Sequence, residues 1–102
     1  MARRTRDWNE GLAEDLRDKA FAREFLTAAV DDGVPLQQAL AKVVRAAGVK
    51  EFAARVDMPS SNLLRAIHPN HNPTQETLER LLKPFGLRIG LAPIARRGRR
   101  AA

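Results

Sequence analysis

Apolar residues recur at helical spacing along much of the chain, separated by residues that start or stop helices. A helix is predicted over residues 19–31, with Asp18 as its N-cap and its end at Gly33. Its apolar face consists of Phe21, Phe25, Leu26 and Ala29. The next helix is predicted to have Pro35 in its first turn and to stop at Gly48. Its apolar stripe consists of Leu36, Ala39, Leu40, Val43, Val44 and Ala47.

A further helix is predicted near each end of the chain. Near the N-terminus, apolar residues at i, i+4 and i+8 predict a short helix, which Gly11 weakens. These residues are Trp8, Leu12 and Leu16. Thr74 is expected to cap the last helix, and Pro84 to end or kink it before Gly86. Its buried face would be Leu78, Leu81, Leu82 and Phe85.

The segment after the last helix alternates apolar and polar residues, which is typical of a strand. It reads Leu87-Arg88-Ile89-Gly90-Leu91 and is followed by Pro93. Since no second strand is predicted in the chain, we expect this one to pair with a second copy or with a partner. The alternative is an extended tail that packs only Leu87, Ile89 and Leu91 on the core.

Residues 50–67 combine two short amphipathic stretches with a break at residues 57–59, a pattern typical of a helix-turn-helix. Ala53 is small where the second helix must approach the first closely. Val56 and Leu63 would fill the angle between the two helices. The alternative is a pair of amphipathic core helices joined by a turn, with no ligand.

The second helix of this motif would present short polar side chains and one long cation to solvent. Such side chains hydrogen-bond to base edges and phosphates, and Arg65 is best suited to guanine. The predicted base-facing set is Ser60, Ser61, Asn62 and Arg65. Lys50 and the loop at residues 68–73, which is rich in proline and asparagine, would hold phosphates. The loop residues concerned are Asn70, His71 and Asn72.

The length of 102 residues fits one small domain with a single core. We expect this domain over residues 7–94, between a disordered basic arm at 1–6 and a disordered Arg-rich tail at 95–102. There is no apolar run near 20 residues and no apolar stretch behind the N-terminal charges, so we expect neither a membrane span nor a signal peptide. The absence of cysteine excludes disulfides and thiol catalysis, and is compatible with a reducing cytoplasm.

The net charge of +6 is distributed unevenly. Residues 7–32 carry eight acidic and three basic side chains, whereas residues 33–102 carry four acidic and twelve basic ones. The basic part would attract polyanions, and the acidic block would be repelled by them. Two kinds of partner are one interpretation, and two solvated faces are the other. The basic arm and the Arg-rich tail would add salt-dependent affinity for DNA, or would only keep the protein soluble.

Enzymatic function is the least favoured class. His68 and His71 are close in sequence, but no acidic residue or cysteine lies near them at a metal-ligand spacing. No triad order, phosphate-binding glycine loop or paired carboxylate motif stands out. We therefore predict no catalytic residue, no metal site and no cofactor.

Several segments, taken in order, resemble the addiction-module antidote proteins, which are small bacterial antitoxins. The resemblance covers residues 18–93, about three quarters of the chain. It is carried by Asp18-Lys19-Ala20-Phe21-Ala22-Arg23-Glu24-Phe25-Leu26, Phe52-Ala53-Ala54-Arg55, Ser61-Asn62-Leu63-Leu64-Arg65-Ala66-Ile67, Asn72-Pro73-Thr74, Thr77-Leu78 and Phe85-Gly86-Leu87-Arg88-Ile89.

The chain departs from the family pattern in the motif itself. Asp57 stands where the family favours glycine, and aspartate tolerates the left-handed conformation better than most residues do. Leu64 replaces the usual tyrosine, which removes a hydroxyl that would reach a phosphate. Ser60 and Ser61 replace longer charged residues, which should alter sequence preference or weaken binding.

The resemblance implies an all-α fold: a phage-repressor-like helix-turn-helix domain of five to six helices with one short C-terminal β-strand. It also implies a type II antitoxin that neutralises a co-encoded toxin and represses its own operon as a homodimer on double-stranded operator DNA. Such a protein would be cytoplasmic and associated with the nucleoid.

The acidic block would suit a basic toxin. The toxin-binding candidates are Glu14, Asp15, Asp18 and Glu24. Two rival functions remain open at this point: a stand-alone helix-turn-helix repressor, and an interaction module that has lost DNA binding.

Overall fold

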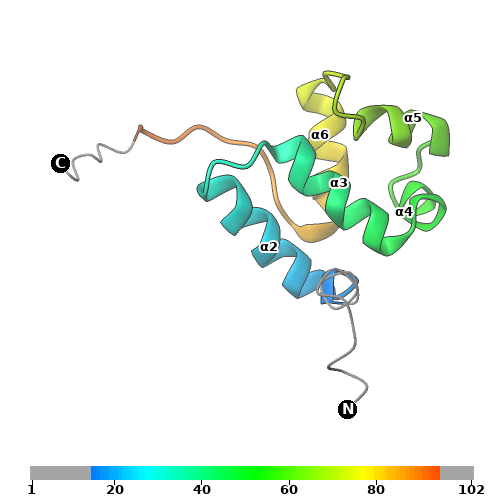
Figure 1. The fold of residues 1–102 in the computed structure, drawn as a ribbon, viewed down its shortest axis with the longest axis horizontal. Helices are drawn as coiled ribbons and strands as arrows, with labels where there is room; N and C mark the ends of the chain where they lie inside the picture. Colours follow the sequence, from blue (N-terminus) through cyan, green and yellow to red (C-terminus); the bar gives the residue numbers. More distant parts are fainter. Residues whose placement is uncertain (1–14, 95–102) are drawn as a thin grey trace, which may run out of the picture.

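Five α-helices and a short 3₁₀ turn make up the part of the chain that the computed structural model describes, residues 15–94 (Figure 1). In chain order they are α2 (Lys19–Asp31), α3 (Leu36–Ala47), α4 (Val49–Arg55), α5 (Ser60–Ala66), α6 (Gln75–Leu82) and η2 (Lys83–Phe85). The all-α class is therefore confirmed for these residues. The predicted basic arm, the Arg-rich tail, Trp8, Leu12 and Glu14 lie outside the described part. Leu16 lies within it and is buried in the core.

The predicted boundaries of α2 are confirmed. The Asp18 carboxylate accepts hydrogen bonds from the backbone N–H groups of Ala20, at 2.9 Å, and of Phe21. These bonds satisfy two donors that have no partner within the helix. At the other end, Gly33 has a φ of 95°, and the Val34 N–H donates to the Ala29 carbonyl at 2.9 Å. This left-handed residue ends the helix and turns the chain toward α3.

One residue, Gly48, separates α3 from α4. Its φ of 101° belongs to a region that residues with a Cβ rarely adopt. Pro35 was predicted to lie in the first turn of α3, but it is the N-cap just before the helix, because its ψ of 137° is extended rather than helical. Its carbonyl still accepts from the N–H groups of Gln38 and Ala39.

The core gathers side chains from every helix around Phe52, which is fully buried. The ring of Phe52 stacks on that of Phe85, with centroids 6.0 Å apart and planes at 18°. This contact joins α4 to η2 across the core. The other buried side chains are Leu16, Ala22, Leu26, Ala39, Leu40, Val43, Val44, Ala53, Val56, Leu63, Ala66, Ile67, Leu81 and Leu82. In α2, by contrast, Phe21 of the predicted apolar face is exposed.

The last helix ends as predicted at its proline. Thr74 caps α6 by accepting from the Thr77 N–H at 3.1 Å. The chain then tightens into η2 around Pro84, because proline has no N–H to continue the α-helical pattern. Gly86, with a φ of 70°, completes the stop.

The predicted strand at residues 87–91 is not seen in the single chain. Residues 87–94 have no regular secondary structure, and the Ile89 N–H donates to the Glu79 carboxylate at 3.2 Å rather than to another strand. The reason is that a strand needs a neighbouring extended backbone, and the remaining elements of residues 15–94 are helical. Leu87 and Ile89 pack on the core, as the alternative interpretation had it, whereas Leu91 is fully exposed.

None of the helices described here is both long and apolar enough to span a bilayer.

The N-cap of α2 yields a test that separates structure from charge at Asp18. Asp18→Ala should lower the free energy of unfolding by about 1 kcal/mol, since two backbone donors lose their acceptor. Asp18→Asn should leave it nearly unchanged, because asparagine caps as well as aspartate does. Urea denaturation followed by circular dichroism measures both. Equal losses for the two variants would mean that the carboxylate charge, not the cap, stabilises this end.

Candidate nucleic-acid interface

A tight turn joins the two short helices α4 and α5. Val56 ends α4, and Asp57 follows with a φ of 55°, the one positive φ among the non-glycine residues described. The Asp57 N–H donates to the Ala54 carbonyl at 3.2 Å, and the Met58 N–H to the Ala53 carbonyl at 2.9 Å. This pair of bonds is the Schellman arrangement that closes a helix after a left-handed residue. The predicted left-handed turn is therefore present.

Small and branched apolar side chains fill the angle between the two helices. Ala53, Val56 and Leu63 are all buried, as their spacing predicted. A larger side chain at position 53 would be overpacked, because protein interiors are close-packed. Pro59 is the N-cap of α5, and its carbonyl accepts from the Leu63 N–H at 3.0 Å. These contacts set the direction in which α5 leaves the turn.

The outer face of α5 is mainly polar. Ser61, Asn62 and Arg65 are exposed and Ser60 is half-buried, while Leu63 and Ala66 face the core. Ser61 and Arg65 are four residues apart, so their side chains leave the same side of the helix. The structure thus presents the predicted base-facing residues to solvent on one short helix.

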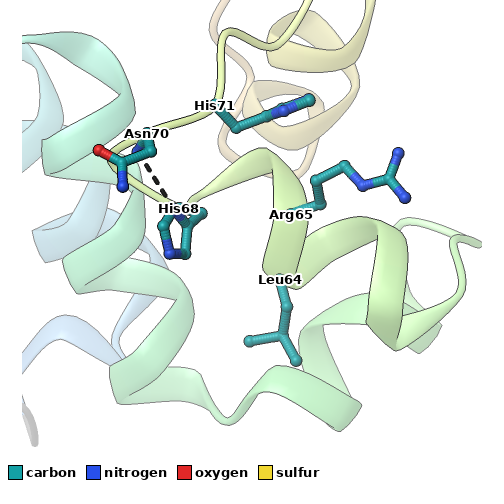
Figure 2. A pocket seen from close by; sticks show the side chains of 5 residues that line it. All are labelled: Leu64, Arg65, His68, Asn70 and His71. Atoms are coloured by element: carbon teal, nitrogen blue, oxygen red, sulfur yellow. Dashed lines mark hydrogen bonds between the residues drawn. The ribbon is translucent and has the colours of Figure 1, made fainter.

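Two hollows flank this outer face. The first, of about 460 Å³, is lined by Leu64, Arg65, His68, Asn70 and His71 (Figure 2). The second, of about 280 Å³, lies toward α6 and shares Arg65 and His71 with the first. It is also lined by Asn62, Asn72, Thr74, Thr77 and Arg80, among others. Arg65 and His71 thus line both hollows, whereas Asn70 lines only the first, and Asn62 and Asn72 only the second.

The loop itself is held by a residue that the sequence did not single out. The side-chain amide nitrogen of Gln37, in the first turn of α3, lies 2.7 Å from the Ala66 carbonyl oxygen. It is also 2.8 Å from the carbonyl oxygens of both His68 and His71. One amide thus donates to the end of α5 and to the following loop. These bonds help to hold the His71 backbone in place near Arg65.

His68 also contributes to the shape of the loop. Its Nδ1 accepts a hydrogen bond from the Asn70 backbone N–H at 3.1 Å, as the dashed line in Figure 2 marks. Within residues 15–94, no group of three or more His, Cys, Asp or Glu side chains is arranged to hold a metal ion.

Positive charge continues from α5 onto the neighbouring elements. Arg80 of α6, which lines the second hollow, also lines a third one of about 430 Å³ beside the turn. The side chains that contribute charge there are Lys19, Arg55, Asp57, Arg80 and Lys83. Four cations and one carboxylate make this region attractive to a polyanion such as a DNA backbone. Sequence reasoning missed Arg80 and Gln37, because only the tertiary fold brings α6 and α3 beside this surface.

The remaining predicted residues lie elsewhere. Lys50 is exposed in the first turn of α4 and lines neither hollow at α5. Asp15, Asp18 and Glu24, the described toxin-binding candidates, are exposed at or near the N-terminal half of α2. In Figure 1, α2 lies on the far side of α3 from α5. The acidic candidates and the outer face of α5 therefore occupy separate surfaces.

Comparison of the chain with protein families, curated proteins and solved structures finds no match.

The turn can be tested through the left-handed residue. Asp57→Gly should keep or raise the free energy of unfolding, because glycine adopts a positive φ without steric cost. Asp57→Val should lower it by about 1–2 kcal/mol, since a β-branched residue is strained there. Asp57→Asn is the control for loss of charge. Urea unfolding curves that do not distinguish Gly from Val would contradict the left-handed turn.

Proposed function

We propose that this protein binds double-stranded DNA by inserting α5 into the major groove and acts as a DNA-binding type II antitoxin that represses its own operon. The observation that supports DNA binding most directly is the polar outer face of α5, carried on a helix-turn-helix with a buried apolar angle. The antitoxin role rests on the resemblance of residues 18–93 to antidote proteins and on the exposed carboxylates of Asp15 and Glu24, which lie apart from α5.

The dimensions of α5 suit this role. Seven residues rise about 10 Å, and a helix with its side chains fits a major groove that is about 12 Å wide. Arg65 would bind guanine through its planar guanidinium, while Ser61 and Asn62 would reach neighbouring base edges. His71 and Asn72, together with Arg80, would contact phosphates and fix the register.

A homodimer would place two α5 helices in successive major grooves about 34 Å apart. The segment at residues 87–94 is one candidate for the contact between copies. It has no regular secondary structure, and the Leu91 and Ile94 side chains are exposed. Pairing with the same segment of a second copy would supply the missing strand partner and cover these side chains.

Neutralisation of a toxin would use exposed carboxylates on α2 and just before it. Asp15 and Glu24 project from this part of the chain, whereas the Asp18 carboxylate is already engaged as the N-cap. We therefore assign Asp18 mainly a structural role and Asp15 and Glu24 the attraction of a basic partner. A co-encoded basic toxin would meet a surface on the opposite side of α3 from α5.

The recognition helix is tested by Arg65→Ala. Binding to a duplex from the protein's own promoter should weaken by about 1–3 kcal/mol, and preference at one base pair should relax. Fluorescence anisotropy with single-base variants of that duplex measures both effects. Arg23→Ala is the matched control, because Arg23 is an exposed arginine on α2, away from α5. Unchanged affinity for Arg65→Ala would refute this docking, and no binding by the wild-type protein would favour an interaction module.

The toxin-binding carboxylates are tested by reversing their charge. The double variant Asp15→Lys and Glu24→Lys should bind the protein encoded by the adjacent gene roughly tenfold more weakly at low salt, with a smaller difference at high salt. Isothermal titration calorimetry measures the affinity, and DNA binding serves as the check on folding. Arg23→Glu is the control of opposite sign and should maintain or strengthen the complex. If the wild-type chain binds no product of a neighbouring gene, the stand-alone repressor is the better assignment.

A further inference from the structure

One side chain on α5 does not share the polar character of its neighbours. Leu64 is 43% exposed, although it lies between the buried Leu63 and the exposed Arg65. Exposed leucines are common on protein surfaces and need no explanation of their own. Within residues 49–73, however, which contain the helix-turn-helix and the following loop, Leu64 is the one large apolar side chain recorded as exposed.

Helix geometry places Leu64 at one edge of the outer face. Successive residues are about 100° apart around a helix, so Leu64 and Asn62 flank the line through Ser61 and Arg65 on opposite sides. The hollows agree with this arrangement, because Leu64 lines the one toward His68 and Asn62 lines the one toward α6. Figure 2 shows the Leu64 and Arg65 side chains leaving α5 in different directions.

The bases offer few apolar partners on the major-groove side. Donors and acceptors dominate the base edges there, and the C5-methyl group of thymine is the apolar group that they present. A leucine beside an arginine would therefore bind most favourably where a methyl group lies next to a guanine. Against a polar base edge, the leucine would leave a donor or acceptor without a hydrogen bond.

We infer that Leu64 is a specificity-determining residue that contacts the C5-methyl group of a pyrimidine adjacent to the base bound by Arg65. This inference rests on the proposed insertion of α5 into the major groove. It gives the motif a mixed preference, in which Arg65 selects by hydrogen bonds and Leu64 by apolar contact. Thymine carries this methyl group in ordinary DNA, and 5-methylcytosine carries it in methylated DNA.

The test removes the methyl group without changing any hydrogen-bonding group. The probe is a duplex selected by the full-length wild-type protein from a library with a randomised centre long enough for two half-sites. It is then synthesised with uracil in place of thymine, one position at a time, and in a second arm with 5-methylcytosine in place of each cytosine. Affinities are measured for the wild type, for Leu64→Ala, and for Val30→Ala as a control. Val30 is exposed to the same extent, 44%, but lies on α2.

At one position of each half-site, uracil should weaken wild-type binding about fourfold, the ratio expected for burying one methyl-sized group. Leu64→Ala should bind the thymine duplex more weakly and should no longer distinguish thymine from uracil. Val30→Ala should retain the wild-type discrimination. Should the effect appear only on cytosine methylation, and be lost in Leu64→Ala, the same contact is made with 5-methylcytosine.

Two results would overturn the inference and leave DNA binding intact. One is equal binding of the thymine, uracil and methylated duplexes by the wild type. The other is an undiminished methyl effect in Leu64→Ala with an unchanged melting temperature, which would assign the methyl contact to another residue. Failure to select any preferred duplex from the library would instead refute the proposed function itself, so the two failures are distinguishable.

Discussion

The outer face of α5 depends on the exclusion of water between α4 and α5. Ala53, Val56 and Leu63 are buried there, and the left-handed conformation of Asp57 lets the chain turn from α4 into α5 within four residues. Without this turn, the same side chains would not meet, and the polar residues of α5 would have no defined direction. The stack of Phe52 on Phe85 extends the constraint, because it anchors α4 to η2, the last helical segment within residues 15–94.

Local signals made the helices predictable from the sequence. Asp18 and Thr74 are caps whose side chains accept backbone hydrogen bonds, and Gly33, Gly48 and Gly86 all adopt a positive φ where a helix was expected to stop. Such devices act over three or four residues, so they can be read without knowing the tertiary fold. The apolar spacing within residues 50–67 likewise predicted that Ala53, Val56 and Leu63 are buried.

Non-local contacts were not predictable in the same way. Alternation at residues 87–91 suggested a strand, but pairing requires a neighbour that a local pattern does not supply, and Ile89 donates to Glu79 instead. The roles of Gln37 and Arg80 were also missed. Gln37 is hydrogen-bonded to the carbonyl of His71, 34 residues away in sequence, and Arg80 lines the same hollow as Arg65. No local pattern connects residues so far apart.

The Gln37 amide has a mechanical consequence. It donates hydrogen bonds both to the end of α5 and to the following loop. Gln37 lies in the first turn of α3, just after the α2–α3 corner. A shift of that corner would therefore move the His68 and His71 carbonyls or would break their hydrogen bonds to Gln37. Through Gln37, α3 therefore connects the α2–α3 corner to the position of His71 beside α5.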